Sequence, residues 1–150
     1  MSPSSATNAA TAREWRELGF FYDTDPAQKA WLFIGSRSGL LQFPRLLREY
    51  ATNPRRGALS DHDHYGPYSH LTVITGRESF ITPNDIRGTQ PHIYRLADLI
   101  EKRLVPSTAG QSFKIDTEYS SQNEFHLHFD VREDGFDPAS ADPLLRQSES

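Results

Sequence analysis

Two neighbouring segments near the C-terminus alternate apolar and polar residues, and this alternation constrains the fold more than any other feature of the chain. In residues 112–119 (SFKIDTEY), every second side chain is apolar or can be buried, and the same holds in residues 123–131 (NEFHLHFDV). A period of two residues is that of a β-strand with one buried face. The segments therefore predict two paired antiparallel strands, and the second strand displays His126 and His128 on its polar face.

The pairing of these two strands is restricted by the same pattern. Directly opposed residues share a face, so the apolar faces coincide only if the connecting loop has an odd number of residues. A five-residue loop places Glu118 opposite His126 and Asp116 opposite His128, whereas a three-residue loop places Glu118 opposite Glu124. Opposite-charge pairs stabilise a sheet by roughly 0.2–1 kcal/mol each. We therefore predict the five-residue loop.

The remaining periodic segments complete an α+β pattern. Residues 18–23 and 30–35 predict a hairpin, and residues 70–75 predict a buried strand that a shorter one, 78–82, follows. Apolar residues at helical spacing predict one helix that Ser38 caps and Asn53–Pro54 ends, and another that Thr89 caps and Pro106 ends. The predicted fold is a two-layer α+β structure of order ββαβ(β)αββ. It has an antiparallel sheet of about five strands with two helices on one face. No internal repeat is visible.

The length of 150 residues predicts a single α+β domain, which we place at residues 15–137. Small and polar residues predict a disordered tail at 1–14 and a flexible tail at 138–150. The chain has no cysteine, and no apolar run approaches the roughly 20 residues that span a bilayer. The start lacks the basic and apolar regions of a signal peptide, so we expect a cytoplasmic protein without a membrane partner.

The formal net charge is −4. Proteins that bind nucleic acid usually present a basic surface to the phosphates, so this charge argues against a nucleic-acid partner. It suits a basic protein partner better. No pattern in the sequence calls for a cofactor.

The first candidate site is the polar run between the first helix and the strand at 70–75. It contains Asp61, His62, Asp63, His64, Tyr65 and Tyr68 around a Gly-Pro turn. Such a set can ligate a metal through His62 and His64, act as a general acid or base, or bind a partner through its tyrosines. It can also be purely structural, with the aspartates bonding to loop amides. We expect a binding site here rather than a catalytic one.

An alternative site lies on the polar face of the last two strands. Residues two apart on a strand point the same way, so His126 and His128 can approach one metal ion, with Asp116 or Asp130 as a third ligand. The same side chains, together with Glu118, can instead form cross-strand ion pairs or a binding face.

The run His70-Leu71-Thr72-Val73 resembles the His-x-Thr-x motif of the two-histidine phosphoesterases. Those enzymes carry the motif twice, on paired strands that face one cleft. The second copy in this chain would be His126 to Phe129, in which His128 stands where the family has Thr or Ser. The resemblance implies that His70, Thr72 and His126 would hold a phosphate.

Three further runs resemble a group of small bacterial proteins that are largely uncharacterised. They are GSRSGLL at 35–41, LSDHDHYGPY at 59–68 and FDPAS at 136–140. The group is similar in size and architecture to immunity proteins, which neutralise a toxin by binding it. The resemblance implies a non-catalytic protein-binding domain, with a basic toxin as a possible partner and no catalytic residues. The alternative is a His-based or metal-dependent hydrolase, which requires the histidines to converge on one pocket.

Overall fold

The computed structural model, which describes residues 5–147, confirms the α+β class but divides the strands between two sheets. Sheet A has the order β1 (Phe21–Asp25), β2 (Ala30–Ser36), β8 (His126–Arg132), β7 (Ser112–Ile115). Sheet B has the order β3 (His62–Tyr65), β4 (Leu71–Thr75), β6 (Asp85–Gly88), β5 (Phe80–Ile81). The prediction of one antiparallel sheet of about five strands is therefore wrong.

In each sheet the two central strands run parallel and the outer strands run antiparallel to them. β2 pairs with β8 and β4 pairs with β6 in parallel, so each sheet is mixed. The antiparallel neighbours β1–β2, β3–β4, β5–β6 and β7–β8 follow one another in the sequence. The local pattern therefore predicts the hairpin at 18–35. The parallel pairs join strands that do not follow one another, and β2 and β8 are far apart in the sequence.

The element order divides the chain into two ββαββ halves. The first half contains β1, β2, α3 (Gln42–Thr52), β3 and β4, and the second contains β5, β6, α4 (Gln90–Leu104), β7 and β8. Each sheet takes the first strand pair of one half and the second strand pair of the other. The fold thus contains an internal repeat that the sequence does not show.

Both halves enter their helix in the same way. The second strand of each half carries a glycine followed by a hydroxyl residue, Gly35-Ser36 and Gly88-Thr89, and the hydroxyl caps the helix. Thr89 accepts a hydrogen bond from His92 N, as predicted, but the cap of the first helical segment, α2 (Arg37–Leu40), is Ser36 rather than Ser38. A side-chain oxygen at this position satisfies an amide that the helix leaves unbonded.

The glycines of the 35–39 run serve backbone packing. A Cβ atom on Gly39 would lie 2.1 Å from the carbonyl oxygen of Gly19. Gly19 itself has a φ of +97°, a conformation that L side chains rarely adopt. This close approach of two backbones explains the Gly-Ser composition of the turn.

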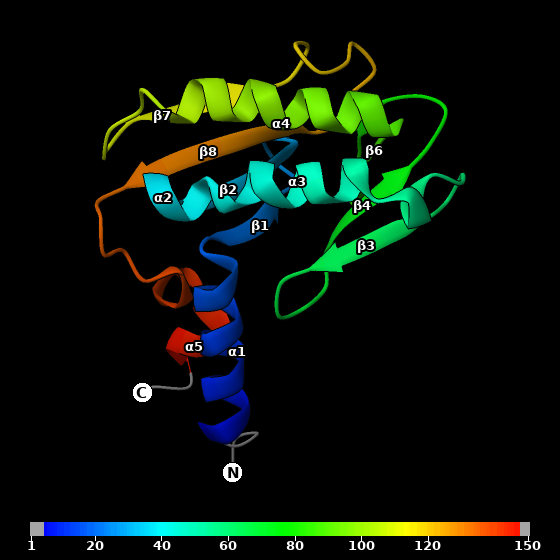
Figure 1. Ribbon diagram of the computed structural model, residues 1–150. Helices are drawn as coiled ribbons and strands as arrows, with labels where there is room; N and C mark the ends of the chain where they lie inside the picture. The colour runs from blue at the N-terminus through cyan, green and yellow to red at the C-terminus, as the bar shows by residue number, and fades with distance from the viewer. Residues whose placement is uncertain (1–4, 148–150) are drawn as a thin grey trace.

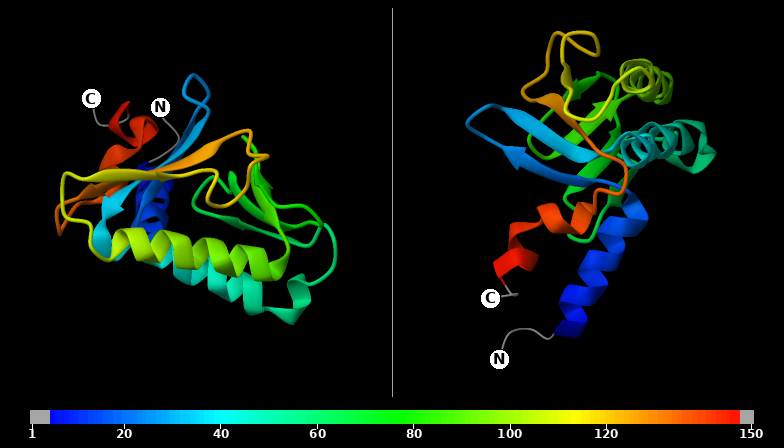
Figure 2. Two further views of the ribbon diagram at one scale, coloured as in Figure 1. Left: turned by 90° about the horizontal axis from the view of Figure 1, so that it is seen from above. Right: turned by 90° about the vertical axis from the view of Figure 1, so that its left-hand side faces the viewer.

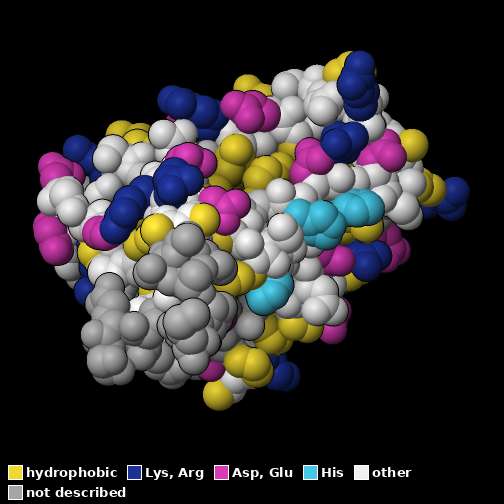
Figure 3. Space-filling model, turned by 90° about the horizontal axis from the view of Figure 1, so that it is seen from below, with side chains coloured by type: hydrophobic (Ala, Val, Ile, Leu, Met, Phe, Trp, Pro, Cys, Tyr) yellow, Lys and Arg dark blue, Asp and Glu magenta, His cyan; other side chains and the backbone are white. Residues whose placement is uncertain are grey.

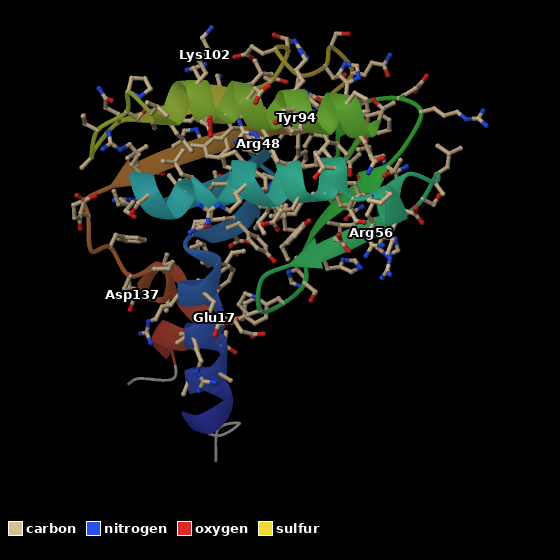
Figure 4. All side chains as sticks on the ribbon, in the orientation of Figure 1. Glu17, Arg48, Arg56, Tyr94, Lys102 and Asp137 are labelled. Atoms are coloured by element: carbon tan, nitrogen blue, oxygen red, sulfur yellow. The ribbon has the colours of Figure 1, made fainter. Side chains whose placement is uncertain are left out.

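Helices α3 and α4 lie side by side along one side of the two sheets (Figures 1 and 2). Arg48 of α3 joins them, since its guanidinium lies 2.8 Å from Asp98 and 2.9 Å from Glu101 of α4, and above the ring of Tyr94 (Figure 4). One cluster of buried side chains extends through both sheets and both helices, from Trp15 to Leu145. The opposite faces of the sheets carry most of the polar strand residues, because side chains alternate along each strand.

The predicted register of the last two strands is wrong. Phe113 pairs with Phe129 and Lys114 pairs with His128, which is the register expected for the three-residue loop. The ladder ends at Ile115, however, so Glu118 does not reach a position opposite Glu124. The rule that paired apolar residues share a face is confirmed, because Phe113, Phe129 and Leu127 are all buried.

Contacts with sheet B explain the early end of the ladder. Tyr119 donates a hydrogen bond to the carbonyl of Arg87, and Asn123 accepts one from the Ile81 amide and donates to Asp116 O. The Glu118 carboxylate accepts a bond from the Asp116 amide, and this bond holds the pKa of Glu118 below its usual value. Residues 116–125 thus bond to sheet B instead of continuing the hairpin, and neither Asp116 nor Glu118 pairs with a strand histidine.

Helical elements lie in the segments predicted as tails. Helix α1 (Ser5–Leu18) covers most of the N-terminal segment predicted to be disordered, and residues 1–4 lie outside the described residues. A 3-10 turn, η2 (Pro138–Ala141), and helix α5 (Pro143–Gln147) occupy the predicted C-terminal tail. These elements lie together at the lower end of the molecule in Figure 1 and in the right-hand view of Figure 2. Arg16 and Asp137 form an ion pair between them at 2.9 Å.

Replacing Phe129 with Ala should destabilise the fold by about 3–5 kcal/mol, because it removes the central ring of a stack. The Phe129 ring lies 4.9 Å from both Phe33 and Phe113 and is fully buried. Urea unfolding followed by circular dichroism measures the loss. Lys102→Ala, at an exposed position of α4, is the control and should change the free energy of unfolding by less than about 0.5 kcal/mol. A similar loss in both variants would contradict the placement of the core.

Candidate functional site

A pocket of about 380 Å³ lies where the ends of the chain meet the two sheets. Its walls come from α1, β1, the starts of β2 and β6, the turn before β4 and the start of α5. Five of the lining side chains are aromatic: Trp15, Phe21, Tyr22, Trp31 and Tyr68. Five others are polar: Asp23, Thr24, His70, Asn84 and Asp142. Concave sites with apolar walls and a few polar groups are the usual ligand-binding sites of proteins.

The buried carboxylate of Asp142 ties one wall of the pocket together. Its Oδ2 accepts a hydrogen bond from Trp15 Nε1 at 2.9 Å and another from the Tyr68 hydroxyl at 2.6 Å, and its Oδ1 accepts from the Leu144 amide. The Asp142 residue is only 1% exposed. Burial, reinforced by the bond to Asp142, raises the pKa of Tyr68, so this phenol stays protonated and keeps donating.

The aromatic rings of the opposite wall are also fixed. Trp31 donates a hydrogen bond from Nε1 to the carbonyl of Thr82 at 2.7 Å. The Tyr22 hydroxyl donates to the carbonyl of Tyr65 and accepts a bond from the Leu71 amide. Burial raises the pKa of Tyr22, which keeps its hydroxyl in the donor form. The hydrogen bonds of Trp31 and Tyr22 thus join sheet A to sheet B and to the turn that follows β5. These bonds hold the pocket wall in shape.

The charge of the pocket is negative. Among the side chains that the structure describes, two aspartates, Asp23 and Asp142, line it, and no lysine or arginine does. Asp23 is exposed at the rim, where its carboxylate accepts a bond from the Thr24 amide. His70, also exposed, is the one histidine in the lining. A positively charged group with an apolar stem therefore suits this pocket best.

The polar run at 61–68 contributes only Tyr68 to the pocket. Residues 62–65 form the edge strand β3 rather than a loop, and its alternation separates the predicted site residues. His62 and His64 point outward, while Asp63 bonds to Arg56 at 2.7 Å on the other face. Tyr65 is half-buried against the core, and Asp61 accepts a bond from the Ala58 amide. This set is therefore not one site.

The alternative site is also dispersed. His126, His128 and Asp130 lie on the outer face of β8, where His128 Nε2 is 3.1 Å from Asp130 Oδ1. Thr72 bonds to His64 on sheet B. On the face seen in Figure 3, the histidine side chains that reach the surface do not all gather in one place. Among residues 5–147, no group of three or more His, Asp or Glu side chains is arranged to hold a metal ion.

The two copies of the His-x-Thr-like motif occupy equivalent positions in the two halves. His70 lies five residues before Thr75, which pairs with Gly88 at the entry to α4. His126 lies five residues before Val131, which pairs with Gly35 at the entry to α2. The phosphoesterase arrangement requires paired strands, but His70 precedes β4 of sheet B and His126 begins β8 of sheet A. The pocket contains His70 and none of His62, His64, His126 or His128. The convergence that a histidine-based hydrolase needs is therefore not found.

Of the residues that line the pocket, sequence reasoning named only Tyr68 and His70 as site residues. Trp15 and Asp142 belong to the segments at or beside the predicted tails, and Trp31 reads as an ordinary strand residue. A tryptophan at the edge of a polar tail is the one available signal, since such a large apolar side chain is rarely left in solvent.

No protein-family model, curated protein or solved structure matches the chain. No helix within residues 5–147 has the length and apolar character needed to cross a membrane.

Replacing Asp142 with Ala should cost about 1–3 kcal/mol, because it leaves the buried Trp15 Nε1–H and Tyr68 hydroxyl without their acceptor. Urea unfolding measures the change. The control is Asp98→Ala, which removes an exposed carboxylate from an ion pair with Arg48 and should cost less than about 1 kcal/mol. Equal losses would show that the Asp142 bonds do not stabilise the C-terminal segment.

His126 should titrate below pH 6.5. Burial lowers its pKa most, Lys114 and His128 lower it further, and Asp116 opposes them. The unfolded chain then binds this proton at a higher pH than the folded chain, so this contribution to stability is lost as the pH falls below about 6.5. NMR titration of the histidine ring protons measures the pKa. Asp116→Asn should lower it further, and a His126 pKa at or above 6.5 in the wild type would contradict this account.

Proposed function

We propose that the chain is a non-catalytic protein-binding domain of immunity type, which neutralises a basic protein partner by binding it. The observation that carries the proposal is the composition of the pocket: among the side chains that the structure describes, its lining has five aromatic side chains and two aspartates but no lysine or arginine. The immunity role itself rests on the sequence resemblance.

The proposed occupant is a lysine or arginine side chain of the partner. The faces of aromatic rings attract cations by about 0.5–2 kcal/mol per contact. Of the five aromatic side chains in the lining, half-buried Tyr68 is the one most open to such a group, because the other four are buried. Arginine can also stack its planar group on a ring and form paired bonds to a carboxylate. Asp23, at the rim, is the carboxylate most accessible to such a group.

The overall charge supports the same kind of partner. The net charge of −4 favours the approach of a basic protein through long-range attraction. Anchoring residues that enter a pocket at the centre of an interface commonly supply most of its binding energy. One basic side chain of the partner in this pocket, with weaker contacts around it, would therefore supply enough binding energy for a specific complex. A cytoplasmic location, which we infer from the sequence, accompanies this proposal.

The chain's two tryptophans, Trp15 and Trp31, both line the pocket, so their fluorescence reports its occupancy directly. The ligand for the test is a short arginine peptide without aromatic residues, and the glutamine peptide of the same length is the neutral comparison. The arginine peptide should change the emission in a saturable way. The glutamine peptide should not.

Asp23→Asn should weaken binding of the arginine peptide about three- to fivefold, because it removes the rim charge and keeps the oxygen that accepts from Thr24 N. The matched control is Asp134→Asn, an exposed aspartate outside the pocket with the same change in net charge, which should alter the affinity less than twofold. Equal effects of the two variants, or no change in wild-type emission, would contradict the proposal. With the source cell's proteins, the wild type should retain a basic partner, and Asp23→Asn should retain less of it.

A further inference from the structure

His62 and His64 form a pair on the exposed edge of sheet B, away from the pocket. They are two residues apart on β3, so both side chains leave the same face of the strand. Both are exposed, and their ring centroids are 5.0 Å apart with the rings nearly perpendicular. Two imidazoles at this separation on a rigid strand can reach a common point in front of them.

Hydrogen bonds orient both rings. His62 Nδ1 lies 3.0 Å from the carbonyl oxygen of Ser60, and because a carbonyl only accepts, this nitrogen carries the hydrogen. The lone pair of His62 is then on Nε2. His64 Nδ1 lies 2.8 Å from the hydroxyl oxygen of Thr72. No hydrogen bond within residues 5–147 uses Nε2 of either ring.

This is the arrangement of metal-ligating histidines in proteins. One ring nitrogen is held by a protein oxygen and the other is presented to the ion. The Ser60 carbonyl sets both the tautomer and the orientation of His62, whereas the Thr72 hydroxyl, which can donate or accept, sets the orientation of His64. The cross-strand neighbours on this face, Thr72 and Ile74, bring no positive charge. The nearby carboxylates point elsewhere, since Asp63 bonds to Arg56 and Asp61 to the Ala58 amide.

We propose that His62 and His64 form a two-histidine site for a divalent transition metal ion of the zinc and nickel class. Imidazole nitrogen suits these ions, whereas Mg²⁺ and Ca²⁺ require oxygen ligands. Two protein ligands leave the other coordination positions to water or to a side chain of a partner. The site is separate from the aromatic pocket, so it stands whether or not the pocket binds a basic partner.

Calorimetric titration of the untagged, metal-free protein with Zn²⁺, and then with Ni²⁺, tests the site. One ion should bind per chain, and Mg²⁺ should not bind. His62→Ala and His64→Ala should each weaken Zn²⁺ binding about tenfold or more, because each removes one arm of the chelate. Zn²⁺ should also shift the ring-proton signals of both histidines together in NMR spectra.

His126→Ala is the matched control, since it removes a histidine from the polar face of the other sheet and should change the Zn²⁺ affinity less than twofold. Circular dichroism verifies that each variant is folded. The proposal is overturned if the wild type binds Zn²⁺ no more tightly than His62→Ala does, or if His126→Ala weakens binding as much. The His62 and His64 variants should bind the arginine peptide as the wild type does, which separates this outcome from that of the pocket.

Discussion

The parallel pairing of β2 with β8, and of β4 with β6, is the constraint on which the rest of the structure depends. Each pair joins strands from opposite halves of the chain, so neither sheet is complete until both halves have formed. The β2–β8 pairing joins residues as far apart as Ala30 and His126, so it must overcome the entropy of closing a long loop before its contacts stabilise the fold. The stacked rings of Phe33, Phe129 and Phe113 lie across the β2–β8 pair and supply apolar burial where this pairing occurs.

The pocket is a consequence of that pairing combined with the positions of α1 and the start of α5. Trp31 from sheet A bonds to the carbonyl of Thr82 beside sheet B, which holds the two sheets together at the pocket wall. Asp142 then closes the other wall by accepting from Trp15 and Tyr68. A binding surface built this way needs residues from both ends of the sequence. It is rigid because its polar atoms are bonded within the protein, and the charge of Asp23 remains available at the rim.

Local patterns in the sequence predict local structure well. The alternation in residues 123–131 predicts a strand with one buried face, and the structure confirms it for β8; Thr89 caps α4 as expected. β3 was missed because an edge strand buries little, and its His and Asp side chains resemble those of a loop. The predicted register was wrong because it was chosen from cross-strand charge pairs, which are worth only a few tenths of a kcal/mol each. The hydrogen bonds that Tyr119 and Asn123 form with sheet B, which the sequence does not reveal, end the ladder earlier.

For the candidate site, Tyr68 and His70 were identified from the sequence, but Trp15, Trp31 and Asp142 were not. By itself the sequence determined the α+β class, the hairpin of β1 and β2, the buried face of β8 and the negative net charge, since these depend on neighbouring residues or on composition. Only the tertiary structure decided that the strands form two sheets, which histidines lie together, and where the aromatic pocket is. Those features depend on contacts between residues distant in the chain, and no local periodicity encodes them.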